Sequence, residues 1–441
     1  MITSEPVIKV ALLQNSRQAK VLLNGTYPPF SGQEAKTQIN ASAGENGTVT
    51  IRDRDERIVM QKNEIELIPA DRANDFFSLS DIRIGIRFHW ERLQTLSFRG
   101  GILFSPNQDG TISVFNLIGL EDYLSSVISS EMSAGAPPEF LKVQAVTARS
   151  WLVAMLEKKK TPRAVQGGGE NEILVWQDVN DHEGFDVCAD DHCQRYQGIA
   201  RIISENVARA INDTRGLFLT HEGRICDARY SKCCGGRTEV FATAWENAHF
   251  PYLAGINDSD RESSPLATEA HVKSWLLSNP EAYCNTTDES LLGQILPSFD
   301  LETKNFYRWQ VVYTAQELTA ILREKSGIDF GALKRIEALE RGASGRISRL
   351  KIEGTRRTVT VGKELEIRRW LSPTHLLSSA FVVSAQHDAA GDISHLTLDG
   401  GGWGHGVGLC QIGAAVMAAR GFKSEDILAH YFRGAVLKKL Y

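Results

Sequence analysis

The sequence has no apolar run long enough to span a membrane and no excess of basic residues. Its 441 residues include 49 Lys and Arg and 54 Asp and Glu, which gives a formal net charge of −5. A chain without a basic excess has little electrostatic attraction for nucleic acid or for an anionic membrane surface. We therefore expect no nucleic-acid partner and no membrane span in this chain.

The N-terminus also lacks the features of a secretory signal. It reads MITSEPVIKVALLQNSR, with an early acidic residue, no basic start and only a short apolar patch. Either the chain is cytoplasmic, or an export signal has been removed from it. There is no internal repeat and no low-complexity tract, and the composition is typical of a soluble globular protein with two or three domains.

Cysteine is sparse and odd in number. Seven cysteines are scattered over the chain, so they do not form the pattern of a disulfide framework. They gather at Cys188 and Cys193, and again at Cys226, Cys233 and Cys234. This clustering favours metal or redox chemistry.

The first cysteine cluster offers ligands of the kind that zinc prefers. His182, Cys188 and Cys193 stand with five and four residues between them, although they lack the diagnostic CxxC spacing. They would leave a fourth position for water, or for Cys233 or Cys234. A Cys188–Cys193 disulfide, or thiols retained for packing, would explain the same pattern.

Residues 120–132 predict a helix with a carboxylate on its apolar side. Glu131 lies seven residues after Leu124 and four after Val127, whereas Glu121 and Asp122 are expected to point elsewhere. A carboxylate on the buried side loses hydration, which favours its protonated form and suits a group that donates and recovers a proton. A helix-end Glu turned to water, or one paired with a buried Arg, explains the pattern equally well.

The next helix is predicted to begin at Pro138 and to be buried. Its segment EFLKVQAVTARSWLVAMLEKKK is apolar almost all round, with Gln144 and Arg149 as the exceptions. A buried guanidinium needs a partner. Arg149 is therefore either part of a structural ion pair or a clamp near Glu131.

A dense group of glycines surrounds Trp403 and His405 near the C-terminus. Glycines allow close approach of the backbone and positive φ angles, while Trp and His offer a stacking surface and a polar group. The segment lacks the lysine and the spacing of a phosphate-binding loop. It suits the wall of a sugar-binding cleft, or a tight strand-to-helix turn without a ligand. The glycines are Gly400, Gly401, Gly402, Gly404, Gly406 and Gly408.

Other segments predict regular structure. Residues 217–239 predict a hairpin, residues 336–362 a β-meander, and Thr314 with Glu317 a capping box that begins a helix. Ser424 is predicted to cap the last helix. Residues 255–310 read as loop and short helix without a chemical signature.

We expect an α+β fold organised around a glycan-binding cleft. Residues 1–118 alternate β-rich runs with Asn-Gly and Asp-Gly turns, which predicts a β-rich N-terminal region. Residues 119–255 would form a core of buried helices that carries Glu131 and the Cys/His cluster. Residues 256–330 would be an insertion of helix and loop. Residues 331–441 would be a β-meander and a glycine-rich C-terminal motif that complete the core, so that the chain beyond the central helices is mixed α/β.

Taken together, these motifs resemble the stage II sporulation protein D (SpoIID/LytB) domain family, in that family's order. The likeness covers most of the chain from about residue 80. Ser133 stands where the family usually has Pro, and Cys233-Cys234 replaces a turn rich in hydroxyl groups. The matching segments are GLEDYLSSVISSEM with LKVQAVTARSWL, DVCADDHCQRYQG, ARYSKCCGGRTE, ERGASGRISRLKI, and GWGHGVGLCQIGAAVMA with EDILAHYFRGAVL.

The resemblance implies a lytic transglycosylase that cleaves peptidoglycan, preferring strands without stem peptides. It identifies Glu131 as the catalytic acid and implies zinc, which we expect to be structural, at His182, Cys188 and Cys193. Glu131 would donate a proton to the oxygen between N-acetylmuramic acid and N-acetylglucosamine, then accept one from the muramyl 6-hydroxyl as it attacks C1. The product is a 1,6-anhydro sugar.

Further residues are expected to contact the sugars or to orient Glu131. Two other functions remain open, namely an amidase enhancer that binds glycan without turnover and a zinc-dependent hydrolase. The expected partners are peptidoglycan strands and an N-acetylmuramoyl-L-alanine amidase, and this substrate places the protein in the cell envelope. The candidate contacts are Gln144, Arg149, Ser231, Trp403, His405 and Gln411.

Overall fold

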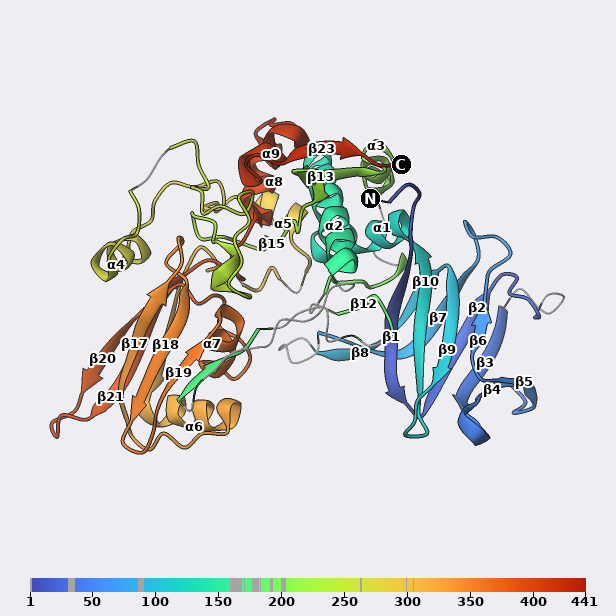
Figure 1. The fold of residues 1–441 in the computed structure, drawn as a ribbon, viewed down its shortest axis with the longest axis horizontal. Helices are drawn as coiled ribbons and strands as arrows, with labels where there is room; N and C mark the ends of the chain where they lie inside the picture. The colour runs from blue at the N-terminus through green and yellow to red at the C-terminus, as the bar shows by residue number, and fades with distance from the viewer. Residues whose placement is uncertain are drawn as a thin grey trace. The chain divides into compact units, whose positions relative to one another are not determined.

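The computed structural model divides the chain into two compact units, and each of them mixes helices with sheets (Figure 1). The first unit is Met1–Gly135, Val179–Leu217 and Lys439–Tyr441, and the second is Ala136–Asp178 and Phe218–Lys438. The α+β class is confirmed, while the division into four segments stays a prediction. The described residues are 2–30, 36–85, 91–158, 169, 171–176, 182, 184–190, 193–199, 204–261, 264–298, 300–303 and 305–441.

The first unit is built on two sheets from the N-terminal region, as the turn-rich β pattern predicts. One has the strand order β12-β1-β10-β9-β6 and the other β5-β4-β3-β2-β7-β8. Neighbouring strands are antiparallel except for β1 with β12. The strands are β1 Val7–Ser16, β2 Gln18–Asn24, β3 Lys36–Ala43, β4 Val49–Asp53, β5 Ile58–Lys62, β6 Ile65–Leu67, β7 Phe76–Ile84, β8 Arg92–Arg99, β9 Gly101–Pro106, β10 Ile112–Gly119 and β12 Val187–Cys188.

Helices α1 Leu120–Glu131 and α3 Glu205–Asp213 contact each other within the first unit. An aromatic stack ties α1 to the sheets, because the ring of Tyr196 lies 5.0 Å from that of Tyr123 in α1 and 5.4 Å from that of Phe98 in β8. The Tyr196 hydroxyl also donates to Asn116 Oδ1 at 2.6 Å, where water does not reach. The chain on both sides of Tyr196 is therefore held firmly against α1.

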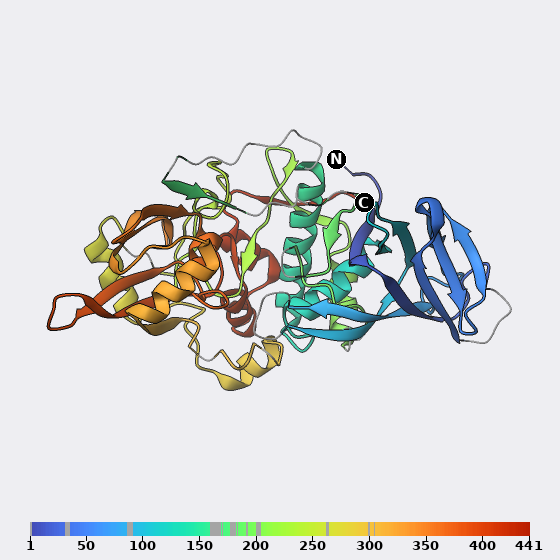
Figure 2. The ribbon, with the colours of Figure 1, turned by 90° about the horizontal axis from the view of Figure 1, so that it is seen from below.

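The long helix α2 Pro138–Lys158 of the second unit is buried, as its sequence predicts. Helices α8 Gln411–Ala419 and α9 Ser424–Tyr431 pack against it (Figures 1 and 2). The two polar exceptions, Gln144 and Arg149, have no exposed surface. The remaining helices of this unit are α4 Glu269–Leu277, α5 Glu289–Ile295, α6 Ala315–Ser326 and α7 Glu364–Trp370.

Four sheets complete the second unit, in the orders β11-β19-β18-β17, β16-β21-β20, β14-β13-β23 and β15-β22. The predicted β-meander is confirmed as β17, β18 and β19, which pair antiparallel in sequence order. The strands are β11 Glu172–Leu174, β13 Leu217–His221, β14 Arg224–Ile225, β15 Tyr230–Ser231, β16 Arg308–Thr314, β17 Leu333–Arg341, β18 Ile347–Gly354, β19 Thr358–Gly362, β20 Phe381–His387, β21 Ile393–Gly401, β22 Leu409–Cys410 and β23 Val436–Lys439.

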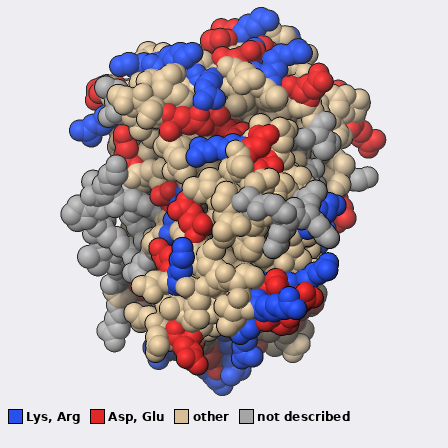
Figure 3. Space-filling view, turned by 90° about the vertical axis from the view of Figure 1, so that its right-hand side faces the viewer, with Lys and Arg blue, Asp and Glu red and all other residues tan. Residues whose placement is uncertain are grey.

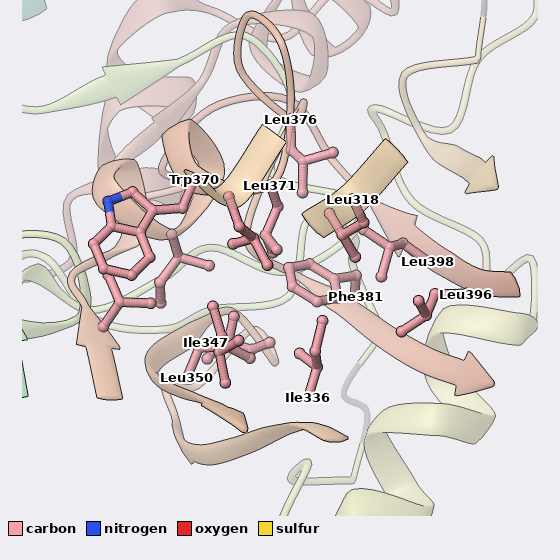
Figure 4. Packing of buried hydrophobic residues seen from close by; sticks show 14 of the residues in the cluster. Leu318, Ile336, Ile347, Leu350, Trp370, Leu371, Leu376, Phe381, Leu396 and Leu398 are labelled. Carbon is pink, nitrogen blue, oxygen red and sulfur yellow. The ribbon is translucent and has the colours of Figure 1, made fainter. Parts of the chain in front are cut away.

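The hydrophobic core of the second unit lies where α6 and α7 meet the sheets (Figure 4). Its most buried members include Leu318 from α6, Trp370 from α7 and Leu350 from β18, each of which is at most 1% exposed. Phe381 and Leu398 join them from β20 and β21. Burial of this many large apolar side chains gives the unit a core of its own.

Two local predictions differ from the structure. The hairpin expected over 217–239 closes early, because β13 pairs with the short β14 and the chain then leaves the sheet, so that β15 pairs with β22 instead. Ser424 is the first residue of α9 and caps nothing, since Lys423 is the N-cap residue and provides no side-chain cap. The capping box of Thr314 and Glu317 is confirmed at the start of α6.

The surface carries charges of both signs. On the face drawn in Figure 3, Lys and Arg side chains are interspersed with Asp and Glu among the coloured residues. Among the described residues, no helix combines the length and apolar character that crossing a bilayer requires.

Candidate functional site

Glu131 is the last residue of α1, and its carboxylate is fixed to a neighbouring segment. The chain turns into extended conformation at Met132, which is buried, while Glu131 is half-buried. Its Oε1 accepts a hydrogen bond from the backbone N–H of Arg195 at 2.9 Å. The carboxylate is therefore held in place at the helix end.

The segment that supplies this N–H is itself well anchored to α1. Ser126 Oγ donates to the carbonyl of Gly198 at 2.9 Å, and Tyr196 is fixed by its aromatic stack. Gly198 has φ +72°, and a Cβ there would lie 2.1 Å from the Ser97 carbonyl oxygen. Only glycine allows this close approach. The donor to Glu131 is thus positioned by the anchored residues that follow Arg195.

The prediction that Glu121 points away from the buried side of α1 is wrong. Its side chain is only 4% exposed, and Oε1 accepts from the Gly216 N–H at 3.2 Å and the Tyr441 hydroxyl at 2.6 Å. Serines on the same helix are buried too, among them Ser126 and Ser129, whose hydroxyls bond to backbone carbonyls. Polar groups tolerate burial when their hydrogen bonds are made, so the apolar stripe alone underestimated how fully α1 is enclosed.

The structure brings His182, Cys188 and Cys193 together, as the sequence predicts. Their ligand atoms lie within 4.8 Å of one another, and all three residues are half-buried. His182 Nε2 is 3.1 Å from Cys193 Sγ, and the His182 ring stacks on Phe185. Neither cysteine is part of a disulfide. One imidazole and two thiols fit the ligand preferences of zinc.

A second cluster, of Cys234, Asp258, Cys284 and Cys410, could also hold a metal. All four residues are buried in the second unit, and their ligand atoms lie within 4.8 Å of one another. The interpretation of residues 255–310 as free of chemical signature missed Asp258 and Cys284. These ligands are far apart in the sequence, so no local spacing could reveal them. Cys226, which the sequence grouped with Cys234, belongs to neither cluster.

The glycine-rich segment between β21 and β22 makes room for other parts of the protein. Gly402, Gly404, Gly406 and Gly408 all have positive φ angles. A Cβ at Gly406 would lie 2.5 Å from the Arg346 guanidinium, and one at Gly408 would lie 2.2 Å from the Arg229 carbonyl oxygen. The glycine density is therefore explained by packing within the second unit. Trp403 and His405 are half-buried between these glycines.

His405 is held as a neutral imidazole. Its Nδ1 accepts the Val407 N–H at 3.0 Å, and its ring meets the edge of Trp245 at 4.8 Å between centroids. Burial lowers the pKa of His405 well below its usual range, and the guanidinium groups of Arg229 and Arg346 lower it further. With Nδ1 as an acceptor, the remaining proton is on Nε2.

The other predicted contacts also lie in the second unit. Gln411 Nε2 donates to Gln144 Oε1 at 3.4 Å, so the structure brings these two residues together. The buried hydroxyl of Ser231 has no hydrogen-bond partner among the described residues. Arg149 is fully buried, and its role as a clamp on Glu131 stays a prediction. Glu131 and the His182 cluster belong to the first unit.

Comparisons with known proteins match two parts of the chain. Residues 108–221, which contain Glu131 and the first cluster, match the model of the stage II sporulation protein family. Residues 239–408 match a domain of unknown function, DUF8618. All four ligands of the second cluster lie outside the first match, and two of them, Asp258 and Cys284, lie within the second.

Several relatives are similar over most of this chain. An uncharacterized protein of Brachyspira hyodysenteriae is 24% identical over 434 residues, which cover 98% of this chain and 92% of that protein. Stage II sporulation protein D of Bacillus subtilis is 24% identical over 322 residues, covering 73% and 75%. The amidase enhancer of the same organism is 26% identical over 322 residues, covering 71% of this chain and 40% of that protein. The family model over residues 108–221 and these relatives agree with the likeness to the stage II sporulation protein D (SpoIID/LytB) family that the sequence motifs indicate.

Proposed function

We propose that this protein is a lytic transglycosylase that cleaves the bond between N-acetylmuramic acid and N-acetylglucosamine in peptidoglycan. The observation that carries the proposal is the carboxylate of Glu131, which is half-buried and bonded through Oε1 to the Arg195 N–H. It is supported by the family match over residues 108–221, which includes Glu131. Strands stripped of stem peptides are the preferred substrate, and the cell envelope is the proposed location.

One carboxyl group serves both halves of this reaction. Oε1 of Glu131 keeps its bond to the Arg195 N–H, so the transferable proton is carried on Oε2. Glu131 gives this proton to the glycosidic oxygen as the C1–O bond breaks and positive charge develops at C1. The carboxylate then takes the proton of the muramyl 6-hydroxyl, whose oxygen attacks C1. The enzyme regains its starting protonation state and consumes no water.

Zinc is proposed at the first cluster as a structural ion. The imidazole of His182 and the thiolates of Cys188 and Cys193 would hold it, since their ligand atoms converge within 4.8 Å. Bound zinc would link β12 to the loop that leads to Arg195. The His182 side chain and the two sulfurs thus support the segment that orients Glu131, and the proton transfer itself needs only the carboxyl group.

The proposal is tested by digestion of denuded glycan strands with the full chain. Wild type is expected to release 1,6-anhydro products, and Glu131→Gln is expected to lower the rate by about 10²–10⁴-fold, the usual contribution of a general acid. Asp122→Asn is the matched control, because Asp122 is an exposed carboxylate on the same helix. If wild type releases no anhydromuramyl product, or Glu131→Gln matches it, the proposal is wrong.

A second candidate is an amidase enhancer that binds glycan without cleaving it. The relative of that name, 26% identical to this chain, favours it. Under this alternative the folded, metal-replete chain would bind strands, release no products, and raise the rate of an N-acetylmuramoyl-L-alanine amidase added to the same assay. Product formation that depends on Glu131 would exclude the alternative as the whole function.

A further inference from the structure

Four ligand groups converge in the interior of the second unit, far apart in the sequence. Cys234 follows β15, Cys410 ends β22, and Asp258 and Cys284 come from the loops before and after α4. Each of these residues is at most 2% exposed. Burial of the Asp258 carboxylate is costly unless a partner compensates its charge, and the three thiols beside it offer ligands for such a partner.

The distances within this cluster suit a single tetrahedral ion. Cys234 Sγ and Cys284 Sγ are 3.7 Å apart, and the ligand atoms of all four residues lie within 4.8 Å of one another. With zinc–sulfur bonds of about 2.3 Å, two sulfurs of a tetrahedral site are about 3.8 Å apart. A disulfide needs only two sulfurs, at about 2.05 Å, and leaves the third thiol and the carboxylate unexplained.

Hydrogen bonds from the surroundings hold the ligands in place. The Asp258 carboxylate accepts the Tyr431 hydroxyl at Oδ1 and the Cys284 N–H at Oδ2, at 2.5 and 2.8 Å. Cys410 Sγ accepts the Cys234 N–H at 3.2 Å, and Cys410 immediately precedes the positive N-terminal end of α8. Such outer hydrogen bonds are what orient the ligands of metal sites.

A buried positive charge lies next to the cluster. The guanidinium of Arg346 is fully buried and donates to the carbonyl oxygens of Cys234 at 3.0 Å and Cys233 at 3.4 Å. Three thiolates and a carboxylate exceed the charge of a divalent cation by two, so a neighbouring guanidinium offsets part of the excess.

We propose that Cys234, Cys284, Cys410 and Asp258 bind one zinc ion in a closed, structural site. The ion links the turn after β15 to the start of α8 and to both loops that flank α4. The turn after β15 also pairs with the glycine-rich segment, since Cys233 and Trp403 exchange backbone hydrogen bonds at 3.0 and 2.7 Å. Zinc at this place therefore stabilises the segment that carries Trp403 and His405. The proposal is independent of glycan cleavage.

Metal analysis of the full chain tests this site. Cys188→Ser removes a ligand of the first cluster, so zinc that remains bound in this variant reports on the second. We expect about one zinc per chain in Cys188→Ser and almost none after Cys284→Ser is added, whereas Cys226→Ser added instead leaves the zinc in place. Cys226 is the matched control because it is equally buried and lies outside the cluster.

A second measurement serves if Cys284→Ser fails to fold. Cobalt(II) exchanged into the Cys188→Ser chain is expected to give the visible spectrum of a tetrahedral ion together with sulfur-to-cobalt charge-transfer absorption. The site is refuted if the folded Cys188→Ser chain binds neither zinc nor cobalt, if Cys284→Ser retains the zinc of its parent, or if mass spectrometry finds a Cys234–Cys284 disulfide in the isolated protein.

Discussion

Glu121 and Glu131, two of the three carboxylates of α1, differ in what they bond to, and this predicts different effects of their removal. Glu121 is buried and accepts from the Gly216 N–H and the Tyr441 hydroxyl. Glu121→Ala leaves both donors without this acceptor, so we expect a loss of about 1–3 kcal/mol in the free energy of unfolding. Urea denaturation measures it. Asp122→Ala, at an exposed position, should stay within about 0.5 kcal/mol of wild type.

A Glu121→Ala chain as stable as wild type would show that these hydrogen bonds contribute little. Activity gives the complementary result, because folded Glu121→Ala should cleave strands at the wild-type rate while Glu131→Gln should not. The pair thus separates a structural carboxylate from the proposed catalytic one on the same helix.

His405 makes stability depend on pH. Its pKa in the folded chain is well below the ordinary value of 6.5, owing to burial and to Arg229 and Arg346. As the pH falls through 6.5, the unfolded chain takes up a proton that the folded chain does not, so the free energy of unfolding decreases. We expect His405→Gln to reduce this decrease between about pH 7.5 and 5.5, as measured by urea denaturation. His430, whose pKa burial also lowers, leaves part of the decrease in place.

An unchanged pH profile in His405→Gln would contradict a neutral, buried imidazole. Thermal melts at pH 7.5 control for any loss of packing against Trp245, because that loss is independent of pH.

For single residues, the sequence predicts Glu131 as the candidate acid but does not predict the N–H group that bonds to its carboxylate. Helical spacing shows on which side of α1 a carboxylate lies, whereas the Arg195 N–H comes from a segment 64 residues away in the chain. Helical spacing did not predict the burial of Glu121, because that burial depends on contacts with Gly216 and Tyr441, which are distant in the sequence.

Two helices of the second unit were predicted to begin with a hydroxyl residue as N-cap, Thr314 for α6 and Ser424 for α9. Only α6 has the predicted cap. Thr314 Oγ1 accepts the Glu317 N–H at 3.2 Å, and Glu317 Oε2 accepts the Thr314 N–H at 2.8 Å. Thr314→Ala should therefore lower the free energy of unfolding by about 1 kcal/mol. Ser424→Ala should cost less than about 0.5 kcal/mol, because Ser424 is not the cap residue of α9.

Chemical denaturation of both variants measures this difference. Equal losses would mean that Ser424 stabilises α9 as much as Thr314 stabilises α6, contrary to the observed geometry.

The sequence predicts elements best where one local rule decides them. The strands of the first 118 residues follow a period of two with clear turns, and α2 follows from its uniform apolar character. Register and pairing are decided by distant partners. Thus β15 pairs with β22 through Tyr230 and Leu409, and this pairing brings Cys410 close to Cys234. The sequence of neither strand predicts the pairing.

For the whole molecule, the candidate groups are divided between two units. Glu131 and the His182 cluster belong to the first, whereas Trp403, His405 and the Cys234 cluster belong to the second. The stage II sporulation match covers only 108–221, so it bears on the proposed acid more directly than on the proposed sugar contacts. Chemistry and binding can therefore be tested by separate substitutions.

Substitution of Trp403 tests sugar binding separately from cleavage. Trp403 is half-buried between glycines and keeps part of its surface exposed, so we expect its ring to stack on a sugar. Trp403→Ala is expected to weaken strand binding by about 1 kcal/mol, roughly fivefold, with a higher KM and a nearly unchanged kcat. Glu131→Gln should do the reverse, with retained binding and lost kcat. Steady-state kinetics together with strand pull-down measures both.

Trp403→Phe is the matched control, because it keeps an aromatic ring and should keep most of the affinity. Thermal melting of each variant accounts for the contacts that Trp403 makes within its own unit, such as the approach of Lys232 Nζ to its ring at 5.8 Å. A Trp403→Ala chain that binds strands as tightly as wild type would remove Trp403 from the proposed sugar contacts. It would leave Glu131 as acid and base untouched, because that role rests on residues of the first unit.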